Sequence, residues 1–230
     1  EKKALFAHFI KANFSPHKYE KYMQPQDGVL NYFKAHNNKS YLSLMYNNNK
    51  LIASMTTRPL DCYIDDKKLP LYYVDFLCVH QKYRKKGNAP KIIYSHYVNS
   101  RYKHDNTVFL FKREGENTAI VPLTAYNNYY FDTFYWDKVV KFDQPNIKTI
   151  LITKQSFHYF VYVYERLMKC STKKFECVIV PNLAHIELLV ENQQMFIAVT
   201  LIDNEPFDCF IFHNTYTTYD GKNSIECITS

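Results

Sequence analysis

Glycine is scarce in this sequence, and the hallmarks of membrane-spanning or exported chains are missing. Only 4 of the 230 residues are Gly, whereas Tyr, Asn, Lys and Ile are common. An AT-rich coding genome gives such a composition, so we interpret the 21 tyrosines first as compositional drift and only second as an aromatic functional surface. No apolar run is long enough to cross a bilayer, and no signal peptide opens the chain. We therefore predict a cytoplasmic protein without a transmembrane segment.

The cysteines and histidines lack the spacing of a metal site. No two cysteines form a C-x-x-C pair, and the histidines show no paired spacing. The six cysteines are Cys62, Cys78, Cys170, Cys177, Cys209 and Cys227. Most lie within apolar, strand-like runs, which predicts reduced and buried thiols. We expect no metal.

The charge balance favours an acidic ligand. The formal net charge is +7, yet the basic residues are scattered apart from the cluster Lys82–Lys86. No nucleic-acid recognition motif accompanies this charge, so we expect no nucleic-acid partner and keep a basic nucleic-acid binder only as a third interpretation. Apolar residues make up 47% of the chain and charged residues 22%, which indicates a globular protein of one large domain or two small fused ones.

One stretch, residues 71–102, carries the strongest functional signal. It predicts an apolar strand at Leu71–Val79, a basic loop at His80–Asn88 and a helix that opens at Ala89-Pro90. The loop contains R-x-x-G-x-A and leads directly to the start of the helix. Free N–H groups there, together with the helix dipole, favour a bound pyrophosphate. Gly87 allows a φ that lets the main chain approach the phosphates closely.

This loop resembles that of the GNAT acyltransferase superfamily, which holds the pyrophosphate of coenzyme A. The match becomes more specific in the letters FLCVH at Phe76–His80. They are followed at matching spacing by Lys82, Arg84, Lys86, Ala89 and Pro90. This pattern is similar to the signature of the N-myristoyltransferases.

The resemblance implies an α+β protein with the GNAT fold. We expect a mixed, mostly antiparallel sheet with a splayed central strand pair flanked by helices, and a partial second GNAT-like half. The N-terminal, acyl-CoA-binding half would span residues 1–142 and the partial C-terminal half residues 143–230. The family's terminal elements would then be missing, as in a shortened relative.

Periodicity and turn residues predict the elements of both halves. The predicted helices are Ala4–Asn13, Asp27–His36, Ala89–Tyr102, Gln155–Cys170 and Leu183–Glu191. The predicted strands are Tyr41–Tyr46, Leu51–Arg58, Leu60–Ile64, Leu69–Val79, Thr107–Phe111, Met195–Ile202 and Phe207–Tyr216. The strand, helix and strand around the ligand loop predict a crossover connection.

The resemblance also implies the residues of the site. Main-chain N–H groups of Phe76 and Leu77, left unpaired by a bulge, would polarise the thioester carbonyl. The acyl-CoA contacts would come from Leu77, Cys78, Val79, Arg84, Lys85, Lys86, Gly87, Asn88 and Ala89. Contacts to a peptide acceptor would come from Thr124, Tyr129 and Tyr130. No covalent intermediate is implied, and apolar neighbours make the Cys78 thiol inert.

The activity implied is acyl-CoA-dependent N-acyl transfer, with myristoyl-CoA or another acyl-CoA as co-substrate. The acceptor would be the N-terminal glycine of a protein or peptide, as for a glycylpeptide N-tetradecanoyltransferase, attacking directly in a ternary complex. In the family a terminal carboxylate takes the proton. Here the base stays open among Asp75, Asp61 and His80, although we interpret Asp75 first as a solvated polar residue.

Two other functions stay open at this stage. One is a relative that binds acyl-CoA or a peptide with little or no turnover. The other is a short-chain N-acetyltransferase that uses the same phosphate loop.

Overall fold

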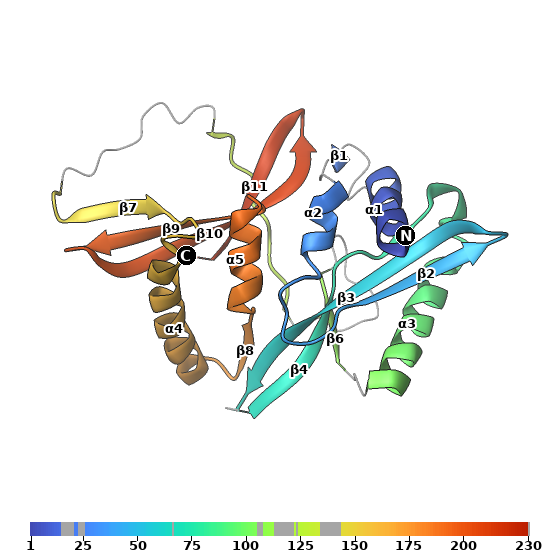
Figure 1. The fold of residues 1–230 in the computed structure, drawn as a ribbon, viewed down its shortest axis with the longest axis horizontal. Coiled ribbons are helices and arrows are strands. Elements are labelled where there is room, and N and C mark those ends of the chain that lie inside the picture. Colours follow the sequence, from blue (N-terminus) through green and yellow to red (C-terminus); the bar gives the residue numbers. More distant parts are fainter. Residues whose placement is uncertain are drawn as a thin grey trace.

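Two sheets with helices packed against them make up the molecule (Figure 1). The computed structural model describes residues 1–14, 21–22, 26–65, 67–104, 108–112, 122, 124–133 and 144–229. Its helices are α1 (Lys2–Asn13), α2 (Gln26–Asn31), the short 3₁₀ helix η1 (Gln81–Tyr83), α3 (Asn88–His104), α4 (Phe157–Lys174) and α5 (Leu183–Glu191). In this part of the chain no helix is both long and apolar enough to cross a membrane.

The first sheet is built around one long strand, β3. The sheet contains β2 (Tyr41–Asn47), β3 (Lys50–Ile64), β4 (Lys67–Val74), β5 (Cys78–Val79), β6 (Phe109–Phe111) and β8 (Cys177–Val180). β3 pairs with β2 and β5 along its first half and with β4 and β8 along its second half. The prediction of two separate strands around Pro59 was wrong. On one side of β3, pairing with β2 ends at Thr57 of β3 and pairing with β8 begins at Asp61 of β3. Pro59 lies in the gap between these two partners, where its missing N–H breaks no ladder hydrogen bond on that side.

The predicted crossover is present. β4 and β6 are parallel, with Tyr72 opposite Phe109 and Val74 opposite Phe111, and α3 connects them through the ligand loop. The pairing of these two strands ends at Val74, immediately before the segment that carries the predicted oxyanion donors. The predicted strand at Thr107–Phe111 begins later, at Phe109, and Thr107 itself lies outside the described residues.

The second sheet is entirely antiparallel. Its strands are β1 (Lys21–Tyr22), β7 (Ile147–Leu151), β9 (Met195–Ile202), β10 (Glu205–Tyr219) and β11 (Lys222–Thr229). β9 and β10 form the predicted hairpin, in which Ile202 pairs with Glu205. Sequence patterns missed β7 and β11, which add strands on either side of it.

The two halves of the chain exchange strands. β8, from the second half, pairs with β3, and β1, from the first half, pairs with β10. One apolar core runs through both, joining Phe6 and Ile10 of α1 to Phe160 of α4 and Ile197 of β9. The predicted boundary between residues 142 and 143 lies outside the described residues, so it stays a prediction.

The second helix, α2, ends earlier than predicted, and its residues are hydrogen-bonded to Gln194. We predicted a helix from Asp27 to His36, but α2 ends at Asn31 and Ala35 has a positive φ of 56°. The Asn31 amide donates to Oε1 of Gln194 at 2.7 Å, and the Gln194 amide donates to the Gly28 carbonyl at 2.9 Å. The end of α2 is thus fixed to a segment far away in the sequence, and the left-handed conformation of Ala35 does not belong to a helix. The other four predicted helices are confirmed, with ends shifted by a few residues at most.

His96 fixes α3, and therefore its N-terminal end, against the first sheet. Its ring is 1% exposed and lies 2.8 Å from Oγ of Ser43 on β2 and 2.9 Å from Oγ1 of Thr57 on β3. Burial lowers the pKa of His96 to about 4, so the ring is neutral at physiological pH. A neutral ring donates one of these hydrogen bonds and accepts the other.

Replacing His96 with Ala should lower the free energy of unfolding by about 2–4 kcal/mol, because the change leaves a cavity and two hydroxyl groups without their partner. Urea denaturation measures this loss. Tyr102→Ala on the same helix is the control, since Tyr102 is 91% exposed and its replacement should cost less than about 0.5 kcal/mol. Equal losses in both variants would contradict the anchoring role of His96.

Candidate functional site

An extra residue between β4 and β5 creates a bulge opposite β3. Thr57 pairs with Val74 and Ser54 with Cys78, so three steps along β3 face four along the other strand. The bulge comprises Asp75, Phe76 and Leu77, which belong to no strand. Such bulges interrupt the ladder and leave main-chain groups without a strand partner.

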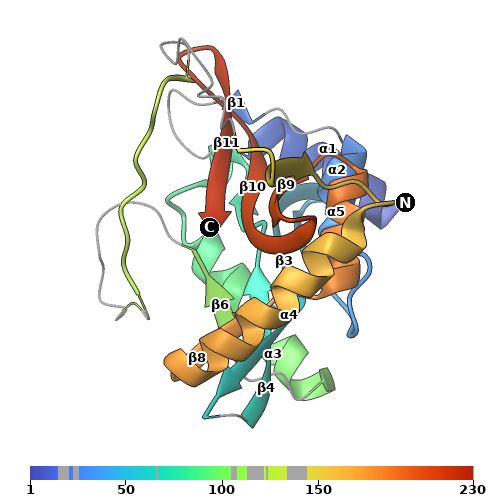
Figure 2. The ribbon, with the colours of Figure 1, turned by 90° about the vertical axis from the view of Figure 1, so that its left-hand side faces the viewer.

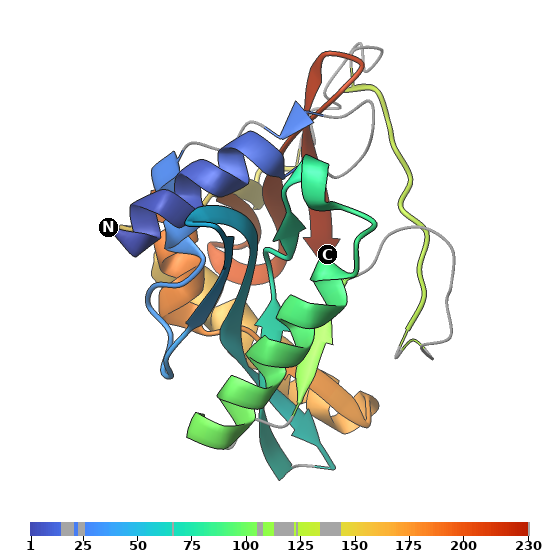
Figure 3. The same ribbon diagram turned by 90° about the vertical axis from the view of Figure 1, so that its right-hand side faces the viewer.

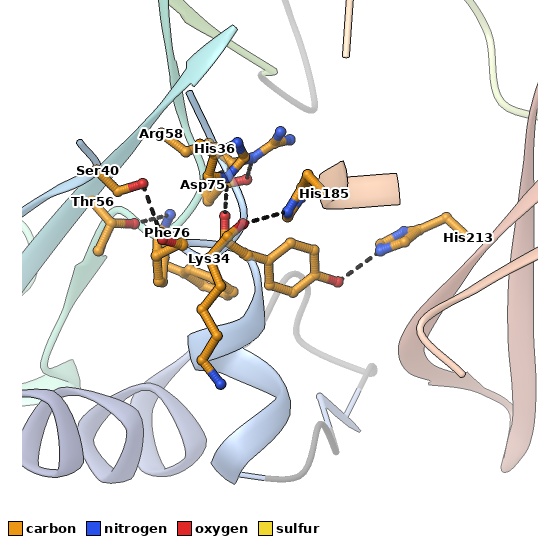
Figure 4. A network of polar contacts seen from close by, with 11 residues as sticks. Lys34, His36, Ser40, Thr56, Arg58, Asp75, Phe76, His185 and His213 are labelled. Carbon is orange, nitrogen blue, oxygen red and sulfur yellow. Dashed lines mark hydrogen bonds and ion pairs between the residues drawn. The ribbon is translucent and has the colours of Figure 1, made fainter. Parts of the chain in front are cut away.

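The two predicted oxyanion donors differ in the structure. The N–H of Phe76 donates to Oγ1 of Thr56 at 3.1 Å, so the expectation of an unpaired donor was wrong for Phe76. The missing strand partner is replaced here by a side chain of β3 (Figure 4). The N–H of Leu77 has no hydrogen-bond partner among the described residues. Of the pair, Leu77 therefore carries the free donor.

Aromatic rings hold the bulge in place. Phe76 is 5% exposed, and its ring packs edge to face against neighbouring rings at centroid distances of 5.5–6.1 Å. These rings belong to Phe6, Phe14, Tyr32 and Phe33. Each well-placed aromatic pair adds about 0.5–1.5 kcal/mol beyond its buried area. The bulge is thus clamped from the side of α1 and α2.

The loop after β5 presents unpaired main-chain donors. Lys85 and Gly87 have positive φ angles of 58° and 71°, with Lys86 between them. This alternation forms a concave row of N–H groups of the kind that binds anions. From Lys85 to Ala89 the N–H groups have no partner within the described residues, and Ala89 lies in the first turn of α3. The sequence predicted this arrangement from Gly87 and Pro90.

Arg84 braces the loop. Its Nε donates to the carbonyl of Val79 at 2.9 Å and its Nη2 donates to the carbonyl of Asn13 at 2.8 Å. Asn13 is the last residue of α1, so the guanidinium joins the end of α1 to the start of the loop, which lies between α1 and α3 in Figure 3. The sequence indicated only the charge of Arg84. Its bracing role depends on α1, which no local pattern brings there.

The three candidate bases have different surroundings. Asp75 accepts from Nε of Arg58 at 3.0 and 3.1 Å, and its side chain is 10% exposed, so its interpretation as a solvated residue was wrong. Burial raises the pKa of Asp75, and the Arg58 charge opposes this shift only partly. Asp61 instead pairs with Lys68 at 2.7 Å towards the far end of β3. His80 accepts from the N–H of Lys82 at 3.2 Å, which occupies its Nδ1.

A network of polar groups beside Asp75 was not found by sequence reasoning (Figure 4). The rings of His36 and His185 lie 4.1 Å apart, and each donates a ring N–H to a main-chain carbonyl. Tyr32 and His213 share a hydrogen bond of 2.7 Å. Burial lowers the pKa of all three histidines, so they are neutral. No sequence spacing signals this group, because its members come from the segment around α2, from α5 and from β10.

The predicted peptide-binding residues lie apart from the bulge. Thr124, Tyr129 and Tyr130 belong to an exposed, irregular segment, the extended yellow-green trace at the outer edge of the molecule in Figures 2 and 3. The ring of Tyr130 contacts that of Tyr219 at the end of β10 at an interplanar angle of 50°, with a centroid distance of 4.7 Å. The binding of a peptide acceptor by Thr124, Tyr129 and Tyr130 stays a prediction.

Cys78, the first residue of β5, is buried. Burial raises the pKa of Cys78 to about 12, which agrees with an inert thiol.

One hollow of about 230 Å³ lies between β3, β8 and the end of α4, and another of about 550 Å³ lies along α3 near Tyr94 and Tyr102. Neither borders the bulge or the loop.

Comparison with known proteins agrees with this geometry. Residues 32–107, about a third of the chain, match the family model of the Myristoyl-CoA:protein N-myristoyltransferase, N-terminal domain. These residues are similar to that domain, and the chain as a whole has a mixed α+β fold similar to that of the N-myristoyltransferases. The matched residues include the bulge, the loop and nearly all of the crossover. None of the curated protein sequences matches this chain.

The N-myristoyltransferase-like fold extends well beyond residues 32–107. A Saccharomyces cerevisiae N-myristoyltransferase with bound myristoyl-CoA superposes with a TM-score of 0.62 at 16% identity, over 93% of this chain and 55% of that one. A second structure of the yeast enzyme with myristoyl-CoA gives 0.61 at 16% identity, over 93% and 58%. The chain therefore spans a little over half the length of these enzymes.

Replacing Thr56 with Val should leave the buried Phe76 N–H without an acceptor and lower the free energy of unfolding by about 1–3 kcal/mol. Thr56→Ser keeps the oxygen and is the matched control, with an expected loss of less than about 1 kcal/mol. Chemical denaturation of the two variants beside the wild type measures the difference. A valine variant as stable as the serine variant would show that Oγ1 does not hold the bulge.

Proposed function

We propose that the protein is an acyl-CoA-dependent N-acyltransferase that transfers a fatty acyl group, myristoyl in the first instance, to the N-terminal amine of a protein or peptide. The observation that carries this proposal is the unpaired row of N–H groups from Lys85 to Ala89 at the start of α3. It follows directly after a bulge with one free main-chain donor at Leu77. The match of residues 32–107 to the N-myristoyltransferase model and the likeness to yeast enzymes with bound myristoyl-CoA support it.

In the proposed complex the loop binds the diphosphate of coenzyme A. Main-chain N–H groups of Lys85–Ala89 donate to the phosphate oxygens, and the dipole of α3 adds to this attraction. The side chains of Lys85 and Lys86 are exposed and neutralise the phosphates from outside. Arg84 keeps the loop in this shape through its hydrogen bonds to Val79 and Asn13.

The thioester lies in our proposal beside the bulge, with its carbonyl oxygen at the N–H of Leu77. A preorganised donor of this kind stabilises the charge on oxygen in the transition state by about 3–4 kcal/mol. The amine attacks the carbonyl carbon directly, and coenzyme A leaves as the thiol. Most of the rate then comes from holding the two reactants together.

We propose Asp75 as the group that takes the proton from the attacking amine. It lies two residues before Leu77, and burial raises its pKa, which makes its carboxylate a stronger base than an exposed one. Arg58 orients the carboxylate by contacting both oxygens. Asp61 is less suitable because it lies further along β3, opposite Pro70 and away from the bulge. His80 is less suitable because its Nδ1 already accepts from the N–H of Lys82.

A second candidate function is acyl-CoA binding without turnover. The hydrogen bond from Phe76 N–H to Thr56 Oγ1 favours it, since this donor is occupied and the proposed oxyanion site is left with one N–H group. Release of coenzyme A in the presence of glycine-initiated peptides separates the two functions, provided that the same protein sample binds the acyl donor.

Replacing Lys85 and Lys86 together with Ala should weaken the binding of myristoyl-CoA about a hundredfold or more, because each charge-assisted contact to a phosphate contributes about 1.5–3 kcal/mol. Isothermal titration calorimetry with myristoyl-CoA and acetyl-CoA measures this. Lys173 and Lys174, in the last turn of α4, provide a matched double replacement that should leave affinity unchanged. Absence of binding of both donors to the wild type at micromolar levels would overturn the proposal.

Replacing Asp75 with Asn should reduce the rate of acyl transfer about 10²- to 10⁴-fold while leaving acyl-CoA binding in place. The wild-type rate should fall as the pH decreases through the raised pKa of Asp75, because protonation removes the base, and this acid limb should be lost in the variant. The control is Asp61→Asn, which should keep both the rate and the pH profile. A folded Asp75→Asn variant with wild-type activity would exclude Asp75 as the base.

A further inference from the structure

We propose that Cys62 and Cys177 form a modification site, at which a small disulfide such as oxidised glutathione converts the two thiols into a cross-link between β3 and β8. The two Sγ atoms lie 3.5 Å apart, although the residues are separated by 115 positions in the sequence. The proposal is independent of the acyl-transfer activity.

Strand register brings the thiols together. In the antiparallel pair of β3 and β8, Cys62 is opposite Ile179 and Ile64 is opposite Cys177. Side chains two residues apart on a strand share a face, so Cys62 and Cys177 are diagonal neighbours on one face of the sheet. A disulfide bond is about 2.05 Å long. The two sulfurs must therefore approach by about 1.5 Å, and because diagonal neighbours lie about 7–8 Å apart, we expect the two strands to move slightly closer as the bond forms.

The two thiols differ in access. Cys177 is exposed, whereas Cys62 is 2% exposed and packs with Leu60, Leu71 and Ile179. Burial and the neighbouring Cys177 thiol raise the pKa of Cys62 to about 11. An oxidant from solution therefore meets Cys177 first, and Cys62 reacts next because it is already held beside the modified sulfur.

The chemistry needs only one disulfide as the oxidant. The Cys177 thiolate attacks a sulfur of oxidised glutathione, whose S–S bond breaks and releases one glutathione thiolate. The Cys62 thiolate then attacks the Cys177 sulfur of the mixed disulfide and releases the second glutathione thiolate. The two cysteine protons pass to the released thiolates. Two cysteine thiols are oxidised to one disulfide, and one glutathione disulfide is reduced to two thiols.

The cross-link would add a second covalent connection, besides the main chain, between the two halves. β8 connects α4 to α5 and is the element of the second half that pairs with β3. In Figure 1 it lies near the labelled end of β4. The closed loop contains the bulge, the phosphate loop and α3. Closing a loop of this length restricts the unfolded chain, and we expect the melting temperature to rise by roughly 10 °C.

The experiment uses the full chain, first reduced, then incubated with oxidised glutathione under conditions in which circular dichroism shows it folded. Peptide mapping by mass spectrometry should join Cys62 to Cys177 with the loss of two hydrogens, and should show no glutathione on either of these two residues. Cys62→Ser and Cys62→Ala should each retain one glutathione on Cys177. Cys177→Ser should form no cross-link.

Cys170 and Cys227 are also exposed and provide the matched controls. Cys170→Ser and Cys227→Ser should form the cross-link like the wild type and show the same rise in melting temperature. A stable glutathione adduct on Cys177 of the wild type would overturn the proposal. So would a wild type that stays fully reduced, or a cross-link that uses Cys170 or Cys227.

Discussion

One additional residue in the strand opposite β3 determines the geometry of this protein. Because Thr57–Val74 and Ser54–Cys78 are paired, Asp75, Phe76 and Leu77 have to bulge out of the ladder. The bulge turns Phe76 into the aromatic cluster, leaves the N–H of Leu77 free and brings Asp75 to Arg58. The acyl-transfer proposal depends on these three consequences.

The surrounding structure holds the bulge and the loop from several sides. His96 anchors α3 to β2 and β3, and Arg84 ties the loop to the end of α1. Both contacts are made by polar side chains with well-defined partners, which position a binding site more accurately than apolar packing alone. The exchanged strands β1 and β8 and the shared core connect the two halves of the chain.

Sequence patterns predicted the backbone of the loop before α3 better than the surroundings of Asp75. Gly87 and Pro90 identified the loop and helix start correctly, because positive φ and a missing N–H are properties of single residues. The environment of Asp75 was predicted wrongly, since Arg58 reaches it only through the pairing of β3 with β4. The prediction of buried cysteines is confirmed for Cys62, Cys78 and Cys209 but was wrong for Cys170, Cys177 and Cys227, which are exposed.

The sequence by itself determined the order of the helices, the central hairpins and the loop before α3, because these follow from periodicity and from the backbone limits of Gly and Pro. Only the tertiary structure decided that Thr56 occupies the Phe76 donor, that His36 meets His185 and that Cys62 meets Cys177. These contacts join segments far apart in the chain. Their formation depends on strand register and on the packing of both halves, which no local pattern encodes.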